Sequence, residues 1–133
     1  MAPPVRDGEL IRIFIPNFLL CALENETRGS FIASVTSMGK AFIAARAALY
    51  FSASQLLYMT SYTHSDLEGS VVTIFLAGEN MDALLTNGGE DEDFLVTDLC
   101  DYLHEALYDY LRLIGEEISL DACKTITVKL FTQ

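Results

Sequence analysis

The sequence has no tryptophan, and among its 133 residues it has only three prolines and three cysteines. Cys21, Cys100 and Cys123 are an odd number, and no two of them have the close spacing of a paired framework. We therefore expect free thiols rather than disulfides, which is typical of a reducing compartment. This predicts an intracellular protein, in the cytoplasm or the nucleus.

Basic residues are scarce, with 8 Lys and Arg against 19 Asp and Glu, for a net charge of −11. The imbalance is concentrated between Asp66 and Asp121, where fifteen acidic residues accompany a single cation, Arg112. Affinity for nucleic acids comes mostly from Lys and Arg that neutralise phosphates. We therefore expect no direct nucleic-acid partner, and for the same reason no anionic membrane surface as partner.

No hydrophobic run is long enough for a membrane span. The most apolar stretch, residues 10–23, is interrupted by Arg12 and Pro16 and is shorter than the ~20 residues that a spanning helix needs. It also lacks the basic segment before it and the small-residue cleavage site after it that a signal peptide requires. The sequence therefore predicts neither a transmembrane helix nor an export signal.

Motifs for cofactors, metals and catalysis are missing as well. The Gly-Gly pair at 88–89 is followed by the acidic run 90–93, which would repel a phosphate. Cys100 and His104 have the i,i+4 spacing of two metal ligands, but a structural pair is the simpler interpretation. His64 lies in ordinary turn chemistry. We expect no cofactor, no metal and no catalytic residue from these patterns.

What the sequence has is enough apolar material for one core. About half of its residues are hydrophobic (51%), and its length fits a single domain spanning 1–133, with a flexible N-terminus at 1–8. Apolar alternation and β-branched residues predict strands at 9–15, 55–63, 69–78 and 124–132.

Helical periodicity predicts one helix from about Phe31 to Tyr50 and a second from about Asp93 to Glu117. Residues 24–30 read as a turn, and 17–23 as either a short helix or a loop. The resulting order is β-α-β-β-α-β. It predicts an α+β, ferredoxin-like sandwich, in which an antiparallel sheet carries two long helices on one face.

The second helix repeats one charge sign on its outward face, at Asp98, Asp101, Glu105 and Asp109, which we call the acidic stripe. Like charges three and four residues apart destabilise a helix by about 0.2–0.5 kcal/mol per pair. The simplest interpretation is a solvated face that keeps an apolar chain in solution. The alternative is a surface for a basic protein partner, since complementary charge accelerates association and selects partners.

The predicted sheet is apolar on both faces. Helices cover only one face, so we expect the other, represented by Phe14, Val72 and Ile74, to be covered by a second copy. The sequence thus favours a non-enzymatic, self-associating protein-interaction module with an acidic helix face. The alternatives are a small-ligand-binding or catalytic domain with a pocket between the sheet and the first helix, and an acidic DNA mimic that inhibits a nucleic-acid-binding protein.

Overall fold

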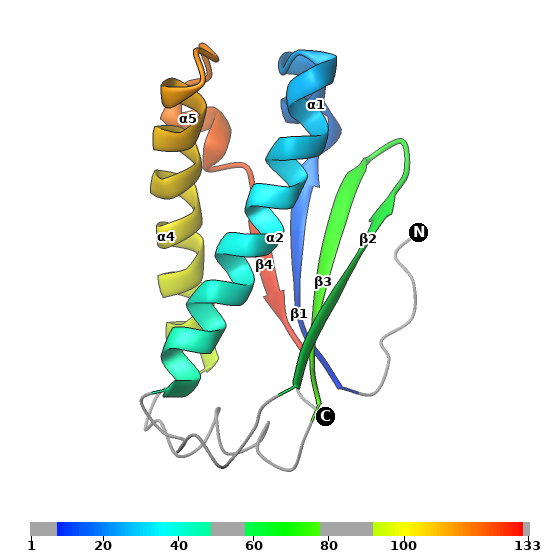
Figure 1. Cartoon of the computed structure of the whole chain (residues 1–133), viewed down its shortest axis with the longest axis vertical. Helices are drawn as coiled ribbons and strands as arrows, with labels where there is room; N and C mark the ends of the chain where they lie inside the picture. Colours follow the sequence, from blue (N-terminus) through cyan, green and yellow to red (C-terminus); the bar gives the residue numbers. More distant parts are fainter. Residues whose placement is uncertain (1–7, 49–57, 78–91, 132–133) are drawn as a thin grey trace.

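The computed structural model describes residues 8–48, 58–77 and 92–131. In these residues the chain forms an α+β fold with one four-stranded antiparallel sheet, in the order β2-β3-β1-β4, and helices α2 and α4 lie side by side over one of its faces (Figure 1). The elements are β1 Glu9–Pro16, α1 Asn17–Ala22, α2 Asn25–Ala48, β2 Tyr58–Ser65, β3 Gly69–Ala77, α4 Glu92–Leu113, α5 Leu120–Cys123 and β4 Thr127–Leu130.

The predicted α+β class is confirmed, but the exact β-α-β-β-α-β order is not matched. Two short helices, α1 and α5, are added to it among the described residues. The segment 17–23, which periodicity left open, is largely α1, with Leu19 and Leu20 buried. Strand β4 begins at Thr127 and not at 124, because the N–H groups of residues 124–126 donate to carbonyls of α5 (Leu120–Cys123). The predicted flexible N-terminus and the predicted loop at 79–93 lie almost wholly outside the described residues.

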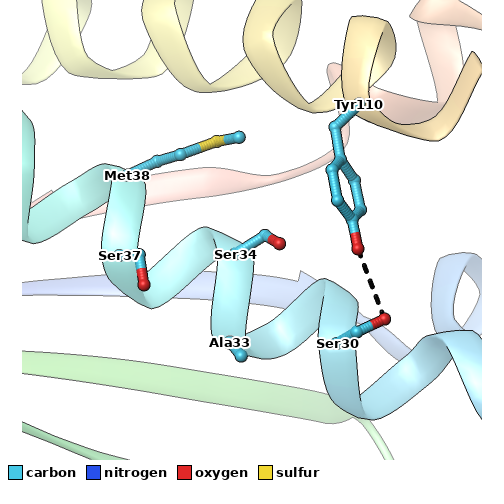
Figure 2. Close-up of a pocket in the computed structure, with 6 residues that line it drawn as sticks. All are labelled: Ser30, Ala33, Ser34, Ser37, Met38 and Tyr110. Carbon is cyan, nitrogen blue, oxygen red and sulfur yellow. Dashed lines mark hydrogen bonds between the residues drawn. The ribbon is translucent and has the colours of Figure 1, made fainter. Parts of the chain in front are cut away.

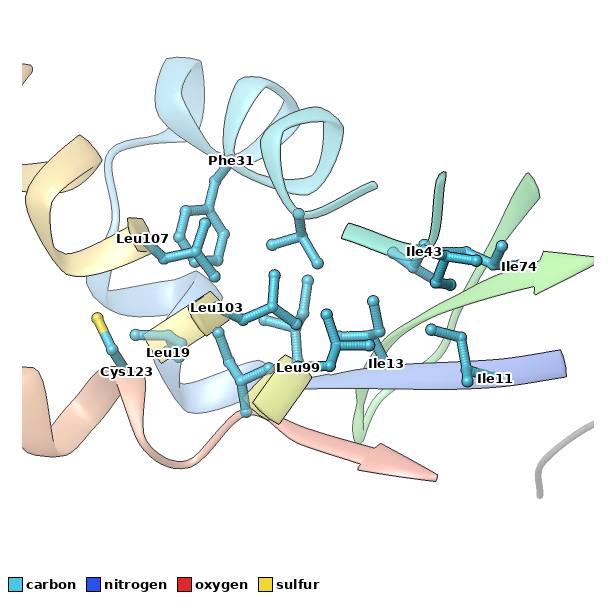
Figure 3. Packing of buried hydrophobic residues seen from close by; sticks show 14 of the residues in the cluster. Ile11, Ile13, Leu19, Phe31, Ile43, Ile74, Leu99, Leu103, Leu107 and Cys123 are labelled. Atoms are coloured by element: carbon cyan, nitrogen blue, oxygen red, sulfur yellow. The ribbon is translucent and has the colours of Figure 1, made fainter. Parts of the chain in front are cut away.

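The core lies between the sheet and the two long helices (Figure 3). Strand side chains alternate between the two faces of a sheet, so Ile11, Ile13 and Ile15 of β1 all point to the helix side, where they are at most 1% exposed. Helix α4 contributes a leucine at every fourth residue, and all five are buried: Leu95, Leu99, Leu103, Leu107 and Leu111.

Helix α2 starts earlier than its apolar pattern predicts. The backbone N–H groups of Thr27 and Arg28 both donate to the carbonyl of Glu24, so the predicted turn at 24–30 is wrong and most of it is the first part of the helix. Its buried residues follow steps of four. They are Phe31, Val35, Gly39, Ile43 and Ala47.

Gly39 lets α2 approach the sheet closely. A Cβ atom at this position would lie 2.9 Å from Cδ1 of Ile13 and 3.0 Å from Cδ1 of Ile74. Both distances are shorter than normal contacts between carbon atoms. A side chain at this position would therefore require the ends of these two isoleucines to move.

Helix α4 ends at Leu113, four residues before the predicted end. The N–H of Gly115, with φ of +88°, donates to the carbonyl of Arg112, and the N–H of Glu116 donates to that of Leu111. This is the hydrogen-bond pattern of a Schellman motif, which needs a left-handed residue after the helix.

The connection between β2 and β3 is shorter than the predicted strands at 55–63 and 69–78 imply. Pairing continues to Ser65 and Ser70, and the Asp66 carboxylate accepts hydrogen bonds from the N–H groups of Glu68 and Gly69. These bonds lower the pKa of Asp66.

No helix among the described residues is long and apolar enough to cross a membrane.

Candidate functional site

The acidic stripe predicted on α4 divides into two parts. Asp98 does not face outward alone, because its carboxylate forms a 2.8 Å ion pair with Arg46 of α2. The Arg46 side chain is 14% exposed and its guanidinium also stacks on the ring of Phe42, 5.2 Å from the centroid. Asp98 therefore joins the two helices, and the partner role predicted for it stays a prediction.

The other three carboxylates of the stripe remain outward. Asp101, Glu105 and Asp109 are exposed, and none of them forms an ion pair with another residue in the described ranges. We call these three residues the acidic ridge. It runs along the outer side of α4 over two helical turns, as the predicted spacing requires.

A large aromatic side chain lies beside the acidic ridge. Tyr102 is 41% exposed and packs on Phe42 of α2, with 5.5 Å between ring centroids and 31° between ring planes. Because its ring is held by this contact, Tyr102 offers a fixed apolar surface next to the carboxylates. Tyrosine in such a position is a common anchor of protein interfaces.

The end of the ridge is also partly apolar. Asp109, Arg112 and Leu113 line a hollow of about 280 Å³, in which Leu113 is 86% exposed. Arg112 lies over the ring of Tyr108, 5.5 Å from its centroid. The single cation of this region is thus at the end of the ridge and forms no ion pair with its carboxylates.

A second hollow, of about 380 Å³, lies between α2 and α4 (Figure 2). Three serines of α2 line it, and Tyr110 of α4 reaches across and donates a hydrogen bond to Oγ of Ser30 at 3.3 Å. Hydrogen bonds with Ser30 and Ser34 lower the pKa of Tyr110. Neither hollow is lined by His64, His104 or Cys100, the residues that would have favoured a catalytic or ligand-binding pocket.

Cys100 and His104 have structural surroundings. Nε2 of His104 is 2.8 Å from the carbonyl oxygen of Ile126, and burial raises the pKa of Cys100. Cys123 is buried, and Cys21 is exposed; all three cysteines are free, as predicted. In residues 8–48, 58–77 and 92–131, no group of three or more His, Cys, Asp and Glu side chains is arranged to hold a metal ion.

The residues predicted for a self-association surface do not share one face. Val72 and Ile74 are 0% exposed and belong to the core under the helices, so they are not available to a second copy and that assignment is wrong. Phe14 has the opposite parity on β1 and lies, half-buried, on the other face. Because β3 is apolar at both parities, its sequence does not reveal which face the helices cover.

The face opposite the helices carries Phe14, Thr73 and Phe75 in its centre, among aromatic and basic side chains. Tyr62 packs on Phe75, with 6.0 Å between centroids, and Arg12 forms an ion pair with Glu9 of its own strand. The Thr73 hydroxyl is fully buried and has no hydrogen-bond partner among the residues that the structure describes. The apolar pattern of the strands alone does not predict this mixed character.

Comparison of the chain with protein-family models, with curated proteins and with solved structures finds no significant match.

Proposed function

We propose that this protein is a non-enzymatic protein-interaction module whose acidic ridge binds a basic surface of a partner protein. The observation that carries the proposal is that Asp101, Glu105 and Asp109 stay without an ion-pair partner within the described residues, although Asp98 of the same stripe is paired. Arg46 therefore neutralises the carboxylate of Asp98, whereas the three carboxylates of the acidic ridge stay on the surface.

The helix that holds the ridge is well anchored. The inward face of α4 buries five leucines, so the like-charge repulsion of about 0.2–0.5 kcal/mol per pair is small beside the packing. The helix can thus present three carboxylates in fixed positions at small cost to its stability. Preorganised charge of this kind supports rapid association with a basic surface.

The described hollows support binding of a protein more than catalysis. They are open depressions on the helix layer, and the chemistry-bearing residues His64, His104 and Cys100 line neither. A DNA mimic would be a special case of the same surface, in which the basic partner normally binds nucleic acid. Competition by DNA for the captured partner would identify that case.

We also propose that the arrangement of strands and long helices is a ferredoxin-like sandwich, to which α1 and α5 are additions. The antiparallel sheet in the order β2-β3-β1-β4 supports this proposal. Such folds host many unrelated functions, so the fold supplies the platform for the ridge and does not identify its partner.

The test is affinity capture from the native host with three immobilised proteins: the wild type, the double variant Asp101→Gln/Glu105→Gln, and the control Glu26→Gln/Glu117→Gln. Both variants change the net charge equally, but Glu26 and Glu117 are exposed residues away from the ridge. Quantitative mass spectrometry then compares the captured proteins.

We expect basic proteins that the wild type and the control retain and that the ridge variant loses. With the purified partner, the ridge variant should associate more slowly and with a weaker salt dependence, because exposed charges act over a Debye length of ~10 Å at 0.1 M salt. Identical captured sets, or identical salt dependence, would show that the ridge only keeps the protein soluble.

A further inference from the structure

The two edges of the sheet are protected to different degrees. Strand β4 is only four residues long and carries Lys129, and both properties hinder pairing with a foreign strand. Strand β2 is the opposite edge, since β3 is its only partner in the described sheet. It has eight residues, YMTSYTHS, without proline, lysine or any carboxylate. Its register with β3 is unbroken by a bulge.

The side chains of β2 are less buried than those of the neighbouring strand β3. None of its side chains from Met59 to Ser65 is fully buried, not even Ser61 and Thr63 on the helix side. Helix α2 packs against β3, and α4 packs against α2 and β4, so the helix layer is centred away from β2 (Figure 1). A second strand can therefore approach without displacing a helix.

The backbone groups that point outward follow from the hairpin. The N–H of Asp66 donates to the carbonyl of Gly69, and antiparallel ladders alternate between hydrogen-bonded and non-hydrogen-bonded pairs. Thr60, Tyr62 and His64 are thus bonded to β3, while Met59, Ser61, Thr63 and Ser65 direct their N–H and C=O groups to the free edge.

We propose that β2 of a second copy occupies this edge in antiparallel orientation, which joins two sheets into one of eight strands about a twofold axis. The register that uses all four outward residues pairs Met59 with Ser65 and Ser61 with Thr63 of the other copy. The axis then passes between the two copies of Tyr62, a non-hydrogen-bonded pair. This proposal does not depend on the acidic ridge.

The charge distribution favours contact between two copies at the β2 edge over contact at other surfaces of the chain. Two chains of net charge −11 repel each other, yet β2 itself has no carboxylate, so contact there brings no acids face to face. The acidic helix α4 lies over the β4 side of each sheet. In the joined sheet the two β4 strands are seven strand spacings apart, roughly 34 Å, which exceeds the Debye length of ~8 Å at physiological salt.

The first test compares Thr63→Pro with Thr63→Ala in the full-length protein. Proline removes the outward N–H of residue 63, which β3 does not use, whereas alanine keeps it. Light scattering and sedimentation at tens of micromolar should show dimers for the wild type and Thr63→Ala. Thr63→Pro should be a folded monomer. Its dimer dissociation constant should rise about a hundredfold, because the twofold symmetry removes one intermolecular hydrogen bond from each copy.

The second test is cross-linking in a variant whose three native cysteines are replaced by alanine. Tyr62→Cys should form an intermolecular disulfide under mild oxidation, because opposed residues of a non-hydrogen-bonded pair bring their Cβ atoms within ~5 Å. Thr60→Cys, on the same face of the same strand, is the matched control. It opposes His64 of the other copy and should not cross-link to itself.

The two tests together decide the proposal, even if Thr63→Pro fails to fold. A monomeric wild type at tens of micromolar would overturn it and would leave the edge to a strand of another protein. A dimer in which Thr60→Cys cross-links as well as Tyr62→Cys, or in which folded Thr63→Pro still dimerises, would also overturn it. Selective cross-linking through residue 62 supports it.

Discussion

Replacing Gly69 by alanine should strongly destabilise the protein, because the new methyl group has no room. A Cβ atom at Gly69 would lie 2.1 Å from the carbonyl oxygen of Ile15 and 3.1 Å from the backbone nitrogen of Asn17. These atoms belong to the backbone of the neighbouring strand and helix, so they cannot rotate away as the end of a side chain can. The contact requires β1 and β3 to separate by about 1 Å at this pair, given normal carbon–oxygen distances of ~3.3 Å.

The magnitude follows from what this separation breaks. Overpacking in a tight site costs typically 1–3 kcal/mol. The 2.8 Å hydrogen bond from the N–H of Asn17 to the carbonyl of Glu68 lies beside the same pair, and its loss adds about 1 kcal/mol. We therefore expect Gly69→Ala to lower the free energy of unfolding by about 2–4 kcal/mol.

Gly29 provides the matched control for this prediction. It lies within α2, and a Cβ atom there would meet nothing within 4 Å. The same glycine-to-alanine change should therefore stabilise the protein by up to about 1 kcal/mol through helix propensity. Urea unfolding followed by circular dichroism measures both variants. A Gly69→Ala midpoint equal to that of the wild type, or a destabilised Gly29→Ala, would refute the steric reasoning.

Two further predictions concern single side chains, and one concerns the ridge. Thr73→Val should leave the free energy of unfolding, measured with urea, unchanged or raise it by up to about 1–3 kcal/mol, because it removes a buried hydroxyl that has no partner among the described residues. A marked loss of stability would reveal a bond to that hydroxyl. Cys123 should react with a thiol reagent far more slowly than exposed Cys21. Because burial raises the pKa of Cys123, the contribution of this thiol to stability should fall as pH rises above 9.0, where the thiol of the unfolded chain ionises first. Asp101→Gln/Glu105→Gln should raise the free energy of unfolding slightly, by about 0.2–0.5 kcal/mol for each like-charge pair that it relieves. A lowered free energy of unfolding would show that these carboxylates stabilise the fold.

The sequence predicted the elements whose signal is local. Alternating Ile11, Ile13 and Ile15 identified β1, and the leucines of α4 identified the most regular helix. The start of α2 was missed, because the polar residues 24–30 resemble a turn while they form most of the first two turns of a helix whose stability comes from later residues. Local pattern does not reveal such tertiary support.

The candidate site was predictable only in part. The spacing of Asp101, Glu105 and Asp109 was enough to place them on one side of a helix. The pairing of Asp98 with Arg46 joins residues 52 positions apart, so no local pattern contains it. Likewise, Val71 and Val72 are equally apolar, and only the packed helices decide which of them is buried.

The position of β1 in the sheet has a consequence for synthesis and folding. One side of β1 bonds to β3, and the other bonds to β4, where Ile13 pairs with Val128. A ribosome that adds ~5–20 residues per second therefore exposes β1 for roughly 6–20 seconds before its second partner exists. During that time one edge of β1 stays unpaired, and its backbone N–H and C=O groups are open to pairing with a foreign strand.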